Sequence, residues 1–222
     1  MSAAAKDPTP YLWWLAGRAS GIVALALVTV AVIVGLTMSS KLLRRPGIGR
    51  TLLALHEHLA LVALGAIAVH GLTLLGDPWL RPGLRGLTIP FAMSYRPLYT
   101  GLGILGGYLA ALLGLSFYAR KRIGARRWRK LHRATVLVWV LGVVHTLGAG
   151  SDGATQWLRA FVLLPAIPIA YLTTVRVLSA RRRGAARADR ASAQLAAPRV
   201  DRAAGAHRRG QRMIANPQPE SR

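Results

Sequence analysis

The run "LHEHLALVALGAIAVH", residues 55–70, is apolar over the length of a helix, yet histidines stand at both of its ends. His56 and His58 lie at one end and His70 at the other. A transmembrane helix needs about 20 mostly apolar residues. Ionisable side chains at membrane depth are costly and mark a function by default. The composition of the whole chain decides which solvent surrounds these imidazoles.

The chain of 222 residues is both apolar and strongly basic. It is 53% hydrophobic, with a mean hydropathy of +0.35, and has 30 Lys and Arg against 7 Asp and Glu. Soluble basic proteins that bind nucleic acid lack repeated long apolar runs, so we expect no nucleic-acid partner. Five runs here are long enough to cross a bilayer, at about 12–37, 52–75, 98–119, 131–149 and 156–179. The sequence therefore predicts an all-α multi-pass membrane protein, a bundle of about five helices in the cell membrane.

The basic residues alternate between the two sides of these spans. The first and third connections hold four and eight Lys and Arg, and twelve more follow from Arg176 onward, whereas the second holds three and the fourth none. Because cytoplasmic loops are enriched in Lys and Arg, the N-terminus is expected outside and the C-terminus inside. We divide the chain into an outer segment (1–11), a membrane domain (12–179) and a disordered Arg- and Ala-rich cytoplasmic tail (180–222).

Four of the histidines fall at two matched depths. The second and fourth spans both enter from the inside, which places His56 and His132 near the inner face and His70 and His145 near the outer face. Intervals of 14 and 13 residues separate the levels by about 20 Å at 1.5 Å per residue. Each level thus has one imidazole from each helix.

Two facing imidazoles in a membrane suit the axial positions of a haem iron, which then passes single electrons. A proton or ion relay in a haem-free transporter or channel, and hydrogen-bonded structural histidines, stay open as alternatives. At about 100° per residue, 14 residues return to within about 40° of one face, while the 12 from His58 to His70 end about 120° away, which favours His56. The 13 residues from His132 to His145 end about 140° away. The fourth span therefore needs a π-bulge or a tight turn there, or two haems dock on different sides of it.

Glycines and arginines near these levels have two interpretations each. Gly17 with Gly21, and Gly103 with Gly107, have the spacing that allows close helix packing, whereas Gly65 and Gly142 lie midway between histidines and leave room for a flat cofactor.

Arg18 and Arg96 are candidates to bind haem propionates, because arginine pairs bidentately with carboxylates. A solvated loop charge is the alternative for Arg96. The third connection is also suited to docking an acidic electron donor.

Three segments resemble the ferric reductase-like transmembrane domain. They are "LHEHLALVALGAIAVHGLTLLGD", "SYRPLYTGLG" and "ARRWRKLHRATVLVWVLGVVHTLGAGSD", and the resemblance spans about residues 12–179. That superfamily includes ferric reductases, NADPH oxidases and the haem-binding membrane subunit of the bacterial methionine sulfoxide reductase system. The resemblance implies that His56 pairs with His132 and His70 with His145 on two irons. It implies two haems b, with one as the alternative, and electron transfer to an acceptor at the outer face.

The chain also departs from that superfamily. Ferric reductases and NADPH oxidases continue into a flavin and nicotinamide domain, but no strand pattern or Gly-rich phosphate loop follows residue 180. The donor is therefore expected to be a separate flavoprotein or a quinone. Six spans are usual for the domain and five are counted here. The chain is expected to be the electron-transfer component of an oxidoreductase, with no catalytic residue of its own.

Overall fold

The computed structural model describes residues 11–40 and 47–196, and all regular structure in these ranges is helical. The elements in chain order are α1 (Leu12–Ser40), α2 (Ile48–Leu75), α3 (Gly83–Thr88), α4 (Pro97–Leu115), α5 (Arg120–Ile123), α6 (Ala125–Leu131), the 3₁₀ helix η2 (His132–Ala134), α7 (Thr135–Ala149), α8 (Gln156–Leu163) and α9 (Ala166–Ala196). Five stretches of helix are long and apolar enough to cross a membrane. The predicted all-α membrane fold with about five spans is confirmed, and the orientation of the termini stays a prediction.

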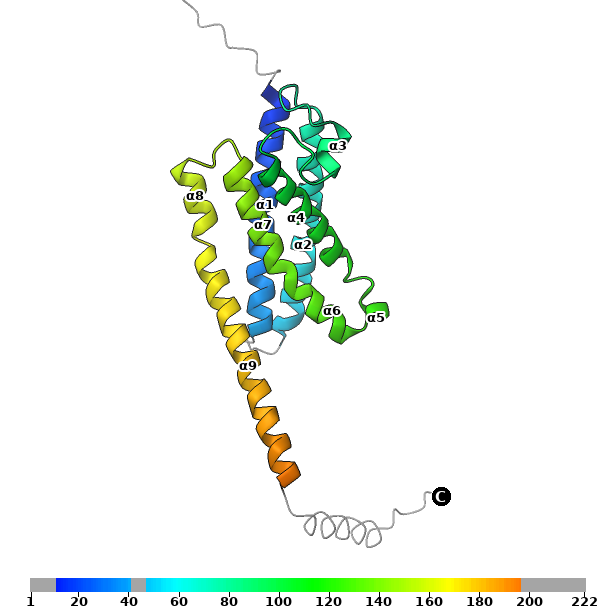
Figure 1. The fold of residues 1–222 in the computed structure, drawn as a ribbon, viewed down its shortest axis with the longest axis vertical. Coiled ribbons are helices and arrows are strands. Elements are labelled where there is room, and N and C mark those ends of the chain that lie inside the picture. The colour runs from blue at the N-terminus through cyan, green and yellow to red at the C-terminus, as the bar shows by residue number, and fades with distance from the viewer. Residues whose placement is uncertain (1–10, 41–46, 197–222) are drawn as a thin grey trace, which may run out of the picture. The chain divides into compact units, whose positions relative to one another are not determined.

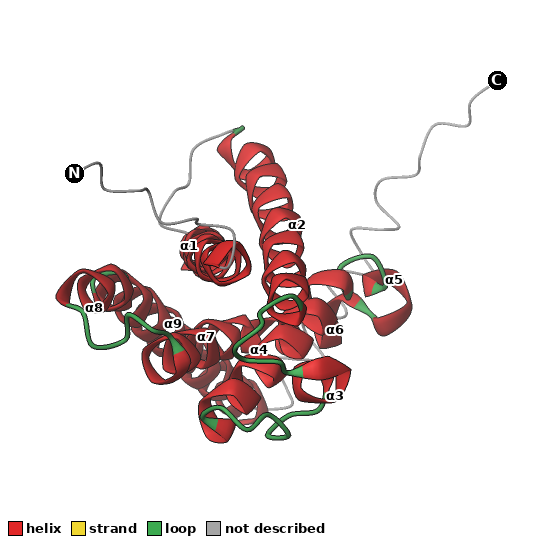
Figure 2. Cartoon of the chain, turned by 90° about the horizontal axis from the view of Figure 1, so that it is seen from above, coloured by secondary structure: helices red, strands yellow, loops and turns green. Residues whose placement is uncertain are grey.

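Four long helices form the centre of the first compact unit, which comprises residues 1–174. In it α1 packs against α2 and α7, and α4 packs against α7 and α2 (Figures 1 and 2). Large apolar side chains on these helices point outward; Leu72 is 63% exposed and Leu112 is 67% exposed. An apolar exterior of this kind is suited to lipid contact.

A second layer of helix packs on one side of this arrangement. Side chains of α8 and of the first turns of α9 join those of α1 and α7 in one buried cluster, which contains Leu25, Val32, Leu36, Trp139, Leu158, Val162, Ile169 and Leu172. A buried hydrogen bond crosses this core: Trp139 Nε1 donates to Thr29 Oγ1 at 3.0 Å, and that hydroxyl donates to the Leu25 carbonyl at 2.7 Å. The indole therefore ties α7 to α1 by both packing and polarity.

The fifth predicted span is not one continuous helix. It divides at Leu164 and Pro165, where α8 ends and α9 begins. Proline has no N–H to donate to the carbonyl four residues earlier, and its ring clashes with that carbonyl, so Pro165 accounts for the break. The predicted fourth span is likewise interrupted, by η2 between α6 and α7.

The disordered tail predicted from residue 180 stays a prediction; within it the structure describes helix as far as Ala196, where α9 ends. The second compact unit begins at Val175, within α9. Side chains 180–194 are all exposed, so no core supports this part of the helix. Alanine and arginine are among the strongest helix formers, and this propensity outweighs the lack of burial. The predictions for residues 1–10 and 197–222 lie outside the described residues.

The connection between α2 and α4 folds back over the end of the bundle. Asp77 is only 3% exposed, and its Oδ1 accepts hydrogen bonds from the backbone N–H groups of Trp79 (2.9 Å) and Leu80 (3.0 Å). The Tyr108 hydroxyl on α4 donates to the Thr88 carbonyl at the end of α3 at 2.6 Å. These bonds hold the connection, including buried Met93, across the helix ends.

Candidate functional site

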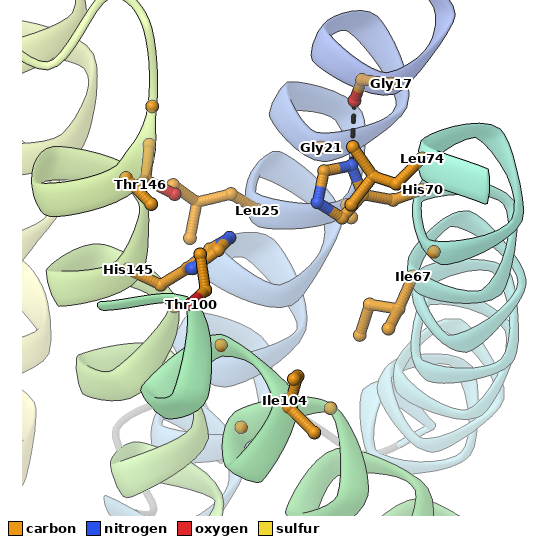
Figure 3. Close-up of a pocket in the computed structure, with 18 of the residues that line it drawn as sticks. Gly17, Gly21, Leu25, Ile67, His70, Leu74, Thr100, Ile104, His145 and Thr146 are labelled. Carbon is orange, nitrogen blue, oxygen red and sulfur yellow. Dashed lines mark hydrogen bonds between the residues drawn. The ribbon is translucent and has the colours of Figure 1, made fainter. Parts of the chain in front are cut away.

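A cavity of about 1020 Å³ lies between α1, α2, α4 and α7. His70 and His145 project into it among apolar side chains such as Leu25, Ile67 and Ile104 (Figure 3). Leu80, Leu87 and Met93 of the α2–α4 connection also line this cavity. The volume lies at the upper end of the range of about 300–1,000 Å³ that is typical of cofactor sites. The space is therefore sufficient for a large apolar group.

The structure brings together the histidines predicted to form the outer pair. The ring centres of His70 and His145 are 6.2 Å apart, and their planes meet at 73°. A metal bound by two imidazoles has metal–nitrogen bonds of about 2.0 Å, and each nitrogen lies about 1.2 Å from its ring centre, which gives about 6.4 Å between the centres. The observed separation fits two ligands on opposite sides of one metal.

The histidines predicted to form the inner pair also meet. The ring centres of His56 and His132 are 6.0 Å apart, with planes at 88°. Neither side chain lines the large cavity. Trp128 stacks on His132 with ring centres 4.8 Å apart, and its Nε1 donates to Ser116 Oγ at 3.1 Å. The inner pair is thus fixed from α6 as well as from the helices that carry it.

The fourth span contains the tight turn that the 13-residue interval required as one alternative. His132 begins η2, and α7 follows directly. A 3₁₀ helix turns by about 120° per residue, so its three residues add about 60° to the rotation of an α-helix. The angular offset between His132 and His145 falls from about 140° to about 80°, which brings the two histidines of this span closer to one face.

His58 lies apart from both pairs. Its side chain is exposed, and its Nδ1 is 2.7 Å from the Ala54 carbonyl of its own helix. This position agrees with the angular arithmetic that favoured His56.

Three of the four paired imidazoles are oriented by carbonyls of neighbouring helices. Nδ1 lies 3.0 Å from the Ala31 oxygen in His56 and 2.7 Å from the Gly17 oxygen in His70. In His145 it lies 2.9 Å from the Tyr99 oxygen. A carbonyl only accepts, so Nδ1 carries the proton in each ring. Nε2 then keeps its lone pair, which is the form that binds a metal.

The two predicted propionate ligands have other contacts. Arg18 lines the cavity, where its Nε is 2.6 Å from Asp152 Oδ2 and its guanidinium lies 5.2 Å from the Trp14 ring centre. Arg96 is exposed, does not line the cavity and donates to the Gly148 carbonyl. Binding of a propionate stays a prediction for both residues.

The two glycines predicted to make room for a cofactor differ in position. Gly142 lines the cavity, whereas Gly65 is exposed, and a Cβ added to it would meet no atom within 4 Å. The cofactor interpretation is therefore compatible with the position of Gly142 and not with that of Gly65.

Basic side chains gather at the end of the bundle that is predicted to face the inside. They belong to α6 and η2 and line a cavity of about 400 Å³: Arg126, Arg127, Arg129, Lys130 and Arg133. All five are exposed. A concave surface of one sign attracts partners of the opposite sign.

The paired histidines suit a metal ion that is already coordinated by a cofactor. In residues 11–40 and 47–196, no group of three or more His, Asp or Glu side chains is placed to hold a metal ion. A pair of imidazoles completes the coordination of an iron whose other four positions belong to a macrocycle. Both histidine pairs therefore fit haem better than a free metal ion.

Residues 20–143, more than half of the chain, match the family model described as "Ferric reductase like transmembrane component". The matched region contains His56, His70 and His132 and ends two residues before His145. No solved structure matches the chain.

Proposed function

Since the chain belongs to the ferric reductase-like transmembrane family, we propose that it is a b-type cytochrome of the cell membrane. Its function is to carry single electrons from a donor at the inner face to an acceptor at the outer face. The observation that carries this proposal is the two imidazole pairs, with ring centres 6.0 and 6.2 Å apart. Haem b held by two imidazoles supplies one-electron chemistry, because a six-coordinate iron has no open position.

The residues of the chain have distinct parts in this proposal. His70 and His145 hold one haem in the large cavity, and His56 and His132 hold the second. Leu80, Leu87 and Met93, which line the cavity, limit the access of water. A dry surrounding lowers the effective dielectric around the iron and so helps to set its potential.

The first test is optical. The full chain, purified in mild detergent from haem-replete cells, is expected to show haem b bands that change on reduction with dithionite. A pyridine haemochrome assay is expected to give about two haems per chain. A colourless preparation would overturn the proposal and favour the alternative, a haem-free transporter or proton channel that uses its intramembrane histidines.

The charge of the inner face supports an acidic flavoprotein as the electron donor. We expect the triple variant Arg126→Gln, Arg127→Gln and Arg129→Gln to be reduced about tenfold more slowly by a reduced acidic flavodoxin at low salt, because long-range attraction is lost. At high salt the rates of variant and wild type are expected to converge. Stopped-flow absorbance at the haem bands measures both rates.

A matched control has the same change of charge elsewhere in the chain. Replacing Arg181, Arg182 and Arg183 on exposed α9 by glutamine is expected to have a much smaller effect. Five basic residues remain in the third connection of the triple variant, so the positive-inside signal is kept. Equal rates for wild type and the Arg126, Arg127 and Arg129 variant at low salt would exclude this docking site.

A further inference from the structure

The three carbonyls that orient the imidazoles share a second feature. Each is followed, four residues later on the same helix, by a glycine that lies against the same imidazole. The carbonyl and glycine pairs are Gly17 and Gly21 for His70, Ala31 and Gly35 for His56, and Tyr99 and Gly103 for His145. We propose that Gly21, Gly35 and Gly103 are positioning residues, which leave open the helix surface on which each axial histidine seats its ring. This inference rests on the proposed haem function.

The reason is the direction of side chains on an α-helix. Each Cα–Cβ bond tilts toward the N-terminus, so a side chain covers the turn that precedes it. A residue four positions after a carbonyl therefore covers the outer side of that oxygen. The carbonyl already accepts the N–H of the helix and has a second lone pair. Glycine alone leaves that lone pair accessible to a donor from another helix.

The distances support this explanation. A Cβ added to Gly21 would lie 3.0 Å from both Cε1 and Nδ1 of His70, and one added to Gly35 would lie 3.1 Å from Cε1 of His56. A Cβ on Gly103 would lie 2.7 Å from Cε1 of His145 and closer still to its Nδ1. In all three cases the nearest atoms belong to the imidazole. Gly21 and Gly103 therefore make room for an imidazole ring. Their spacing in the sequence did not distinguish this role from close packing of helices.

The arrangement repeats along one pair of helices. On α1 the carbonyls of Gly17 and Ala31 are 14 residues apart, as are Gly21 and Gly35. On α2 the histidines that contact them are also 14 residues apart. Glycine is a poor helix former, so its placement at both levels needs a specific cause. The repeated arrangement of a carbonyl and a following glycine against each histidine of α2 is such a cause.

These carbonyl and glycine pairs would affect the redox potential of the iron through the imidazole that they orient. An Nδ1–H bonded to a carbonyl makes the ring a stronger donor, which stabilises ferric iron. Loss of that bond is expected to raise the midpoint potential. The ring planes meet at 73° and 88°. Nearly perpendicular imidazoles give low-spin ferric haem a strongly anisotropic electron paramagnetic resonance signal, which changes when either ring rotates.

The test compares Gly21→Ala, Gly35→Ala and Gly103→Ala in the full chain with Gly65→Ala. Gly65 is a helical glycine of α2 with open space around it, so it controls for the change in helix propensity. Haem content, the ferric resonance signal and the midpoint potentials are measured on protein that elutes as a single species with unchanged helicity.

We expect Gly103→Ala to lose about half of the haem. Gly21→Ala and Gly35→Ala are expected to keep haem, each with a changed resonance signal and a raised potential at one centre, while Gly65→Ala matches the wild type. Gly35→Ala demands the smallest shift and keeps the test available if the others do not fold. Wild-type signals and potentials in Gly21→Ala and Gly35→Ala would overturn the inference. A wild-type protein without haem would instead overturn the proposed function itself.

Discussion

Alanine in place of His70 or His145 is expected to remove about one haem of two. Either change would leave the haem proposed for the large cavity with a single imidazole, and a haem held by one ligand in place of two is expected to dissociate during purification. The inner pair belongs to different residues, 14 and 13 positions away along the same helices, so its haem is expected to stay. The pyridine haemochrome ratio of haem to protein measures the loss.

Controls for this experiment come from the same two helices. His132→Ala is expected to remove the other haem, and the double variant of His70 and His132 to be colourless. His58→Ala is expected to keep both haems, because this side chain is exposed and bonded within its own helix. Loss of all haem from His70→Ala alone would indicate one site in place of two.

The largest effect on stability is expected at Trp139. This side chain is 7% exposed and belongs to the cluster that joins α1, α7, α8 and α9. Trp139→Ala would leave a cavity there and is expected to lower the free energy of unfolding by about 3 kcal/mol. This value is at the lower end of the range for replacing a buried tryptophan by alanine. Moving an apolar side chain from lipid into the protein changes the free energy little, so the variant loses mainly packing contacts. Thermal unfolding in detergent, followed by circular dichroism, measures the effect.

Two further variants separate packing from hydrogen bonding. Trp139→Phe keeps most of the apolar volume and removes the bond to Thr29 Oγ1, so a loss of about 1 kcal/mol is expected. The neighbouring Val140 is 40% exposed, and Val140→Ala is expected to change stability by less than about 0.5 kcal/mol. Equal melting temperatures for Trp139→Ala and Val140→Ala would exclude Trp139 as a principal contact between the helix layers.

The sequence predicts the spans well because bilayer thickness fixes their length. Because depth in a membrane can be counted in residues, it places His70 and His145 at one level and His56 and His132 at the other; their pairing on two irons is what the family resemblance implies. It does not predict how the fourth span turns. Intervals show that 13 residues misalign two histidines, but only the backbone shows that a 3₁₀ turn at His132 reduces the offset.

Other features were missed because they depend on tertiary contacts. Asp152 lies in the fourth connection, far from Arg18 in the sequence, and only the fold brings the two side chains together. The sequence alone predicts no role for Gly35, although it follows Gly21 by the interval that separates His56 from His70 on α2. That shared interval was the available signal. Its meaning required the knowledge that α1 is the neighbour of α2.

The matched interval on α1 and α2 has a consequence for the geometry of the pair. Fourteen residues are two heptads. A contact that repeats every seven residues drifts around a straight α-helix, so two helices that keep this contact wind around each other in a left-handed supercoil. The contacts between α1 and α2 therefore repeat as in a short coiled coil. The imidazoles and the glycine backbone take the contact positions that aliphatic side chains occupy in soluble coiled coils. One inserted or deleted residue between the two levels would turn one carbonyl and glycine pair by about 100° while leaving the other in place. The length of this segment is thus expected to matter to the geometry of both histidine pairs, in addition to the identity of its glycines.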